Sequence, residues 1–249
     1  MSKGESKSGQ EPSPVTEPEG EPVRVLLAED NVIASELISM MAKRLGCRVD
    51  TVSNGLDAID LIYRAQQLDK AYDLLLLDAM MPVLTGSETA RRLRAEGIDS
   101  SQLPIIAVTA ATDPAEVREY LRAGMQGYLS KPVSLAEFSA CIDAWAPGRS
   151  KKPHRGRRTP SDALRRRYDL RKIEVLERFE TAVTAGHLAP GIATELREHL
   201  HKLAGTAGSF GETDLSVAAS QGESLLEGAA PDGLRGAISR SLDLLKAVA

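Results

Sequence analysis

The chain has 249 residues, of which 42% are hydrophobic and 27% charged, a composition typical of a folded soluble protein. A domain commonly takes about 100–150 residues, so the length allows two small domains or one large one. Two cysteines are too few for a disulfide framework or a cysteine-based zinc site. The longest apolar run, residues 103–111, is about half of what a membrane helix needs, and the N-terminus lacks an apolar signal region. We therefore expect a cytoplasmic protein without membrane contact.

Charge divides the chain into blocks. Residues 148–172 carry eleven Lys and Arg against two Asp, while the parts on either side are acidic. Residues 1–22 are rich in Glu, Pro, Ser and Gly and are expected to form a disordered tail. Residues 148–167 have no apolar periodicity, which predicts a basic linker. The predicted domains are therefore residues 23–147 and residues 168–249.

The first predicted domain alternates short apolar segments with amphipathic ones. The strands are expected within residues 23–29, 47–53, 73–78, 103–110 and 127–130. The helices are expected at residues 31–45, 55–67 and 86–96, after the cap at Asp113-Pro114, and from the capping box at Ser134 to Trp145. Five such β-α units in about 125 residues predict an open, doubly wound parallel α/β sheet.

Polar side chains follow the predicted strands at the ends that meet in such a sheet. They are Glu29 and Asp30 after the first strand, Asp78 after the third, Thr109 after the fourth and Lys131 after the fifth. Each of them alone has a simpler explanation, because a lone aspartate at a strand end usually lies in a turn or caps a helix. A threonine is also a common strand residue, and a lysine is a common surface charge. The combination favours a functional site.

Three crowded carboxylates repel one another unless a cation lies between them. Hard oxygen ligands with room for water favour Mg²⁺. A carboxylate held there can attack phosphorus and form an aspartyl phosphate. The hydroxyl of Thr109 and the ammonium of Lys131 can then donate to the phosphoryl oxygens. The residues therefore favour phosphoryl transfer with Mg²⁺ as cofactor.

Residues 23–147 resemble the receiver domain of two-component response regulators, through VLLAEDN, LLLLDAMMPVLTG, IIAVTA and GYLSKP. The resemblance implies a flavodoxin-like fold with phosphorylation at Asp78. It implies that Asp30 and Asp78 bind Mg²⁺ directly with the Met80 carbonyl, and that Glu29 binds through water.

The same resemblance implies further roles at this edge. Thr109 and Lys131 would contact the phosphoryl group. Tyr128 would be the switch aromatic that turns inward as Thr109 moves. The Lys131-Pro132 bond would be cis, which proline allows. A receiver also catalyses its own phosphorylation and dephosphorylation.

The second half of the chain reads as helical throughout. The expected helices are residues 163–185, 190–209, 212–228 and 232–248, which predict an up-and-down four-helix bundle. In the second of these, Leu196, Leu200 and Leu203 mark the core face. His201 points nearly opposite and is expected to be exposed. Gly205 and Gly208 lie near it, and a helical glycine costs about 1 kcal/mol against Ala. Bare backbone could let another protein approach His201, let a neighbouring helix pack, or mark a frayed end.

The segment HLHKLAGTAGSFGETDLSVAAS resembles the histidine-containing phosphotransfer domain, over roughly residues 170–249. The matching residues are His201, Leu203, Gly205, Thr206 and Gly211. The family's lysine three residues after the histidine is Ala204 here. The resemblance implies that His201 is a phosphoacceptor, and that Gly205, Thr206 and Gly208 form the surface around it.

Together these readings predict a phosphorelay protein, with a receiver joined to a phosphotransfer bundle. Its expected partners are a sensor histidine kinase and other receiver or phosphotransfer domains, with dimerisation on phosphorylation. No ATP-binding kinase domain is recognisable. Two alternatives stay open: a regulator in which His201 is silent, and a regulator that contacts DNA through the basic linker. The second is less favoured, because no aromatic or helix-turn-helix pattern accompanies the charge, so nucleic acid is not expected as a partner.

Overall fold

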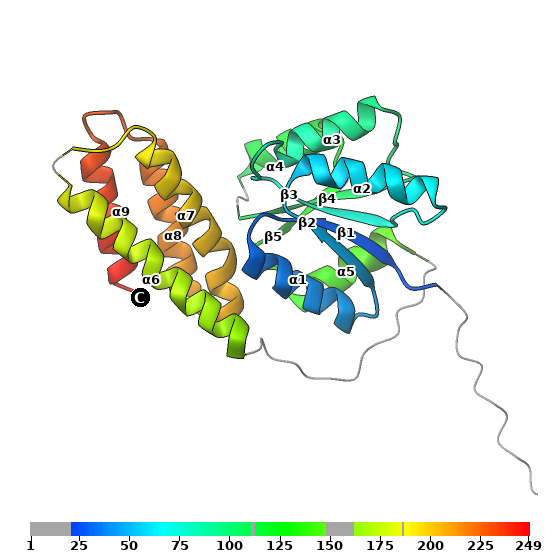
Figure 1. Ribbon diagram of the computed structural model, residues 1–249, viewed down its shortest axis with the longest axis horizontal. Coiled ribbons are helices and arrows are strands. Elements are labelled where there is room, and N and C mark those ends of the chain that lie inside the picture. Colours follow the sequence, from blue (N-terminus) through cyan, green and yellow to red (C-terminus); the bar gives the residue numbers. More distant parts are fainter. Residues whose placement is uncertain (1–20, 111–112, 148–161, 186) are drawn as a thin grey trace, which may run out of the picture.

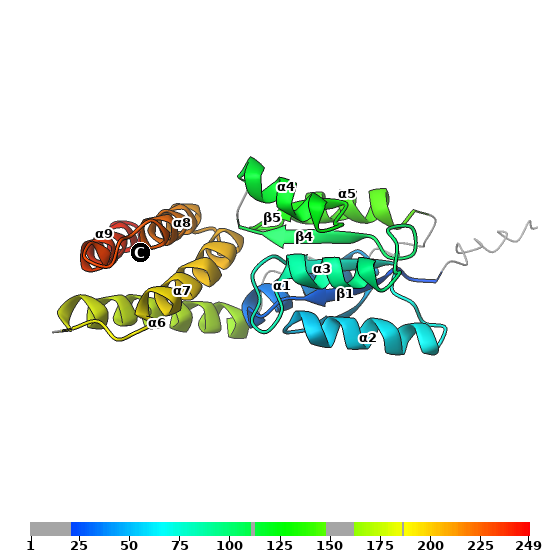
Figure 2. The same ribbon diagram turned by 90° about the horizontal axis from the view of Figure 1, so that it is seen from above.

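The computed structural model describes residues 21–110, 113–147, 162–185 and 187–249. These residues form an α/β domain and an all-helical region that lie side by side (Figures 1 and 2). The predicted disordered tail, except its last two residues, and residues 148–161 of the predicted basic linker lie outside the described residues.

The α/β domain is built on a five-stranded parallel sheet with the order β2-β1-β3-β4-β5. Its strands are β1 (Arg24–Ala28), β2 (Arg48–Val52), β3 (Leu74–Asp78), β4 (Ile105–Thr109) and β5 (Gly127–Ser130). This confirms the predicted doubly wound parallel sheet. The strand order reverses direction between β1 and β3, and in such sheets a crevice opens there at the carboxyl ends of the strands.

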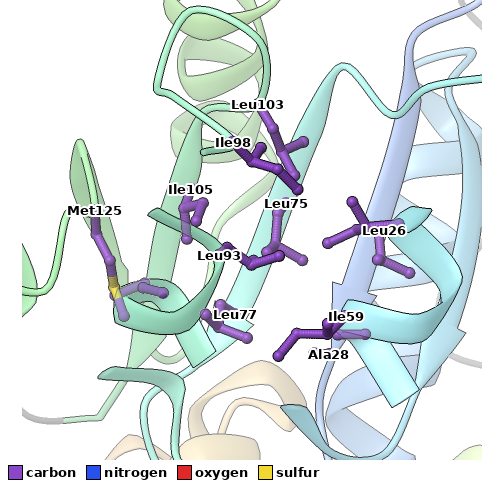
Figure 3. Close-up of a cluster of buried hydrophobic side chains, with 14 of the residues drawn as sticks. Leu26, Ala28, Ile59, Leu75, Leu77, Leu93, Ile98, Leu103, Ile105 and Met125 are labelled. Carbon is purple, nitrogen blue, oxygen red and sulfur yellow. The ribbon is translucent and has the colours of Figure 1, made fainter. Parts of the chain in front are cut away.

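Helices cover both faces of the sheet, so the central strand is apolar along its length. On one face α2 (Gly55–Gln67), α3 (Gly86–Ala95) and α4 (Pro114–Arg122) pack over the layer drawn in Figure 3, which includes Leu75 and Leu77. On the other face α1 (Val32–Arg44) and α5 (Leu135–Trp145) pack over a second layer that includes Leu74 and Leu76. A strand buried on both faces needs this continuous run of leucines.

Side chains fix where the helices start. Ser134 and Glu137 form the predicted capping box of α5, and Asp113 caps α4 ahead of the predicted first-turn proline, Pro114. Asn31 caps α1 by accepting from the Ile33 backbone N–H. The chain therefore turns from strand into helix immediately after the acidic end of β1.

The C-terminal region is all helical. It consists of α6 (Asp162–Thr184), α7 (Ile192–Ala207), a 3₁₀ turn (Gly208–Phe210), α8 (Thr213–Glu227) and α9 (Leu234–Lys246). Leu196, Leu200 and Leu203 of α7 lie in one apolar core with residues of the other three helices. Within the described residues, no helix combines the length and apolar character required to cross a membrane. We refer to this region as the bundle.

Helix α6 corrects the C-terminal limit of the predicted linker. It begins at Asp162 and ends at Thr184, which confirms the helix expected at residues 163–185 and shows that residues 162–167 are helical and not part of a linker. Leu164 is buried, and Tyr168 stacks on Phe210 with ring centroids 4.3 Å apart. The charge of the exposed arginines 165–167 is what assigned these residues to the basic linker.

Gly86 lets α3 start directly against the end of β3. A Cβ atom there would lie well inside van der Waals contact with the carbonyl oxygen of Asp78. We expect Gly86→Ala to lower the free energy of unfolding by roughly 1–3 kcal/mol, because backbone cannot move aside cheaply. Urea titration monitored by circular dichroism measures this. Gly127→Ala is the matched control, because its Cβ would meet only Ile106 Cδ1 at 3.6 Å. Equal stability of the two variants would contradict the expectation.

Candidate functional site

An acidic cluster lies at the carboxyl ends of β1 and β3. Glu29 and Asp30 directly follow β1, and Asp78 is the last residue of β3. One carboxylate oxygen from each lies within 4.8 Å of the others. The strand order brings these residues together, because β1 and β3 are paired neighbours. The three predicted carboxylates therefore form one cluster.

The side chain of Lys131 enters this cluster from the end of β5. Its ammonium nitrogen lies 2.7 Å from Glu29 Oε2 and 3.0 Å from Asp78 Oδ2. Its side chain is only 4% exposed, and its backbone N–H donates to the Thr109 carbonyl at 2.7 Å. The Lys131-Pro132 peptide bond is cis. One buried cation therefore balances two buried carboxylates.

Burial sets the electrostatics of this group. It raises the pKa of Glu29 to about 8, with Asp78 adding to the rise and Lys131 opposing it. Burial would lower the pKa of Lys131, but Asp78 and Glu29 outweigh it and raise that pKa. Lys131 thus stays charged, while an ionised Glu29 is costly to hold.

Thr109 lies buried at the end of β4, and its hydroxyl is linked to α4. Its Oγ1 is 3.2 Å from the hydroxyl of Tyr120, which donates to Glu116 at 3.3 Å. Tyr128 of β5, the predicted switch aromatic, is 44% exposed and so does not lie inward in this structure. Met80 is exposed, and its backbone N–H donates to Asp78 Oδ1 at 3.2 Å.

Comparison with known proteins identifies this α/β domain. A sequence model of the family described as "Response regulator receiver domain" matches residues 25–143. Two-component response regulator 24 of Arabidopsis thaliana is 30% identical over 117 residues, which cover 47% of this chain and 79% of that protein. The chain belongs to the response regulator receiver family.

Two further relatives are similar to the receiver. The crystal structure of the receiver domain of sensor histidine kinase PA1611 from Pseudomonas aeruginosa PAO1, with a magnesium ion in its active site cleft, is 35% identical. It covers 50% of this chain and 97% of that chain, with a TM-score of 0.45. Hybrid signal transduction histidine kinase I of Dictyostelium discoideum is 32% identical over 114 residues. Those residues cover 45% of this chain but only 7% of that kinase.

Helix α7 of the bundle lies over the acidic cluster of the receiver. The ammonium of Lys202 pairs with Asp30 at 2.5 Å, and the Asn31 side-chain amide donates to the Lys202 carbonyl at 3.0 Å. Further along α7, a Cβ on Gly205 would lie 2.9 Å from Lys131 Cδ. The turn that carries His201 is therefore held against the receiver.

His201 is buried, which corrects the expectation that it points into solvent. It is 8% exposed, and its Nδ1 lies 3.2 Å from Glu223 Oε1 of α8. Its Nε2 is also buried and has no hydrogen-bond partner among the described residues. The helical period assigns one buried face to a helix, but α7 contacts both the rest of the bundle and the receiver.

Thr206, predicted to lie on the surface around His201, is buried in this structure. It is 1% exposed, and its hydroxyl donates back to the Lys202 carbonyl at 2.8 Å. Gly205 and Gly208 do lie at the receiver, where Gly208 faces Pro132. A hydroxyl that satisfies its own helix backbone is common for threonine, so its position in the motif did not predict exposure.

Sequence reasoning missed three residues of the site. Asn31 joins Glu29 to the bundle, since its backbone N–H donates to Glu29 Oε1 at 3.2 Å. Tyr120 contacts Thr109, and Glu223 contacts His201. Only Asn31 carried a signal, because an asparagine between a strand and a helix predicts an N-cap. The other two lie on separate helices, and their spacing alone does not predict contact.

Glu29 makes the stability of the protein depend on pH. Because its folded pKa of about 8 is above its ordinary value of 4.5, the folded state holds this proton more tightly. The contribution of this proton to the free energy of unfolding is fully present below about pH 4.5, and it is lost as the pH rises towards 8. We expect Glu29→Gln to remove this loss, which reaches at most about 1.4 kcal/mol per pH unit. Urea titrations in EDTA between pH 5 and 8 test it, and parallel pH profiles for both proteins would contradict it.

Proposed function

We propose that this chain is a phosphorelay protein in which Asp78 accepts a phosphoryl group and His201 carries or passes one. One observation carries the proposal. The buried Nε2 of His201 has no hydrogen-bond partner among the residues that the structure describes, and this histidine lies on the helix turn that contacts the receiver's acidic cluster through Lys202 and Asp30. The family of residues 25–143 supports the receiver half.

The acidic cluster fits a magnesium ion. Three carboxylate oxygens within 4.8 Å of one another form a hard donor set of the kind that Mg²⁺ prefers. Asp30, Asp78 and the Met80 carbonyl would hold the ion, with Glu29 reaching it through water. When bound, Mg²⁺ would supply positive charge to the phosphoryl oxygens.

The receiver's own residues account for the chemistry at Asp78. A carboxylate oxygen of Asp78 attacks phosphorus, and the leaving group of the donor departs with the electron pair of the broken bond. Lys131, already 3.0 Å from Asp78 Oδ2, and the Thr109 hydroxyl donate to the new phosphoryl oxygens. The link from Thr109 to Tyr120 then couples this event to α4.

Glu223 prepares His201 to act as a nucleophile. A carboxylate only accepts hydrogen bonds, so the imidazole donates its Nδ1–H to Glu223. In the neutral ring this leaves the lone pair on Nε2, the nitrogen without a hydrogen-bond partner in the described part of the chain. Glu223 is thus a positioning residue that selects the reactive tautomer.

Sensor histidine kinases and other receiver or phosphotransfer domains are the proposed partners. The curated relatives include histidine kinases, of which this chain matches a small part. A kinase of that type would supply the phosphoryl group from ATP, and we propose that the transfer takes place in the cytoplasm.

Phosphoryl labelling tests the proposal. We expect wild-type protein given acetyl phosphate and Mg²⁺ to gain alkali-labile phosphate on Asp78 and acid-labile, alkali-stable phosphate on His201. Asp78→Ala should lose the first kind, and His201→Gln the second, as measured by intact mass after acid and alkali treatment. His199→Gln is the matched control on the same helix and should keep both. Absence of alkali-stable phosphate with acetyl phosphate and with a phosphorylated receiver as donors would favour the regulator with a silent His201.

The role of Glu223 is tested by two substitutions. We expect Glu223→Ala to slow phosphorylation of His201 about tenfold, because the ring loses the hydrogen bond that fixes its tautomer. Glu223→Gln should retain most of the rate, since its amide oxygen also accepts from Nδ1–H. Glu227→Ala, one turn further along α8, is the control. Rates of His201 labelling and ¹⁵N chemical shifts of the ring measure the effect, and equal rates for all three variants would contradict it.

A further inference from the structure

The receiver and the bundle of one chain pack closely together. Ile33 and Leu37 of α1 belong to the same apolar cluster as Leu164 and Tyr168 of α6. A small cavity of about 10 Å³ lies beside Lys131 and Gly205, between the two domains. That is at the lower limit of what one water molecule needs. Apolar side chains of both domains therefore share one core at this contact.

Polar contacts frame this apolar patch on two sides. Lys202 pairs with Asp30 at 2.5 Å and accepts from the Asn31 amide through its carbonyl at 3.0 Å. At the other side Arg167 of α6 pairs with Glu36 of α1. These contacts fix the position of α7 over the carboxyl ends of β1 and β3.

Two glycines of the bundle match the receiver surface. A Cβ on Gly208 would lie 2.5 Å from Pro132 Cγ, and one on Gly205 would lie 2.9 Å from Lys131 Cδ. Gly208 has a φ of −61°, which any residue adopts, so its own backbone does not require glycine. Contact with the receiver supplies the reason for a residue type that weakens a helix.

The connection between the domains favours this contact over contact with another molecule. Helix α5 ends at Trp145 and α6 begins at Asp162. The residues between them can span at most about 60 Å, whatever their conformation. A tether of this length gives an effective concentration on the order of millimolar. A second chain at micromolar concentration competes poorly with that.

We propose that the phosphoryl group passes between Asp78 and His201 of the same chain, across this docked interface. This proposal rests on the proposed function, and it makes Asp78 and His201 of one chain each other's partner in the transfer. The lone pair of His201 Nε2 forms the N–P bond while the bond from Asp78 Oδ to phosphorus breaks. The electron pair of that bond returns to the Asp78 carboxylate. No proton moves, because Nδ1 keeps its proton towards Glu223, and the reverse transfer follows the same path.

The kinetic order of transfer tests the proposal. Wild-type chains labelled at Asp78 with acetyl phosphate should label His201 with a first-order rate constant that is unchanged over a hundredfold range of protein concentration. Gly208→Ala should lower that rate constant at least tenfold and increase the hydrodynamic radius. Gly236→Ala in α9 is the matched control, because its Cβ would meet only Arg240 Nη1 at 3.5 Å. It should leave both quantities unchanged.

A mixture of two defective chains separates the outcomes. One chain carries His201→Gln and the other Asp78→Ala, so only transfer between chains can label His201. We expect this mixture to be much slower than wild type at equal concentration. A wild-type rate proportional to concentration and matched by the mixture would overturn transfer within the chain while leaving the phosphorelay intact. Absence of His201 label in every sample would overturn both.

A charge exchange supplies a second test that does not depend on the glycine. Glu36 and Arg167 are exposed and lie outside the reacting groups. We expect Glu36→Arg alone and Arg167→Glu alone each to slow transfer two- to fivefold, and the double exchange to restore it. Two single variants with wild-type rates and a wild-type hydrodynamic radius would contradict the docked geometry.

Discussion

The buried ammonium of Lys131 connects the parts of this structure that matter for function. It lies between Glu29 and Asp78, two carboxylates that burial would otherwise make costly to ionise. The stem of the same side chain lies against Gly205, and the next residue, Pro132, lies against Gly208. A buried cation needs compensation from every side, so its position is tightly determined. Lys131 and Pro132 therefore determine both the charge balance of the receiver and the position of the bundle against it.

Most of the fold could be predicted from the sequence because it rests on local signals. Each of these signals involves residues that are close in the sequence. They are the continuous leucines of β3, the caps at Asp113 and Ser134, and the helical periodicities. The start of α6 was predicted within one residue, but the end of the predicted linker was not, because residues 162–167 belong to this helix. There a run of arginines surrounds Leu164 and Tyr168, whose burial depends on α1 and on Phe210, far away in the sequence. The high charge of this segment favoured a linker, although its apolar residues belong to the bundle core.

The receiver part of the site was predictable from the sequence, because its residues lie at the ends of strands. Glu29, Asp30, Asp78, Thr109 and Lys131 each end or follow a strand, and a parallel sheet brings such positions to one edge. The bundle side was harder. The burial of His201 and its contact with Glu223 depend on which helices face each other and on the receiver above them. Tyr120 reaches Thr109 for the same kind of reason, since α4 folds back over the end of β4. Contacts between elements that do not follow one another in the chain leave no local pattern.

The charges at the interface suggest why docking could be both specific and reversible. Lys202 with Asp30 and Arg167 with Glu36 attract the two domains. On the α4 side, partial burial together with the carboxylates of Asp113, Glu227 and Glu223 raises the pKa of Glu116, so acidic groups of the receiver and the bundle face one another there. Ion pairs attract the two domains at one edge of the interface, and acidic groups repel each other at the other edge. Together they fix the relative orientation of the domains without adding much to the affinity between them.

The proposed relay needs this balance, because Asp78 and His201 are both buried while the domains are docked. A donor from outside can reach Asp78 or His201 only when the domains separate, whereas transfer within the chain needs them together. The position of the lysine in the His201 motif fits this view. Ala204 stands where the phosphotransfer pattern that this segment resembles has a lysine, and the neighbouring Lys202 of α7 pairs with Asp30 of the receiver. The charge of Lys202 therefore holds the receiver against the bundle. For this reason, the stability of the docked state depends on the charge of the acidic cluster.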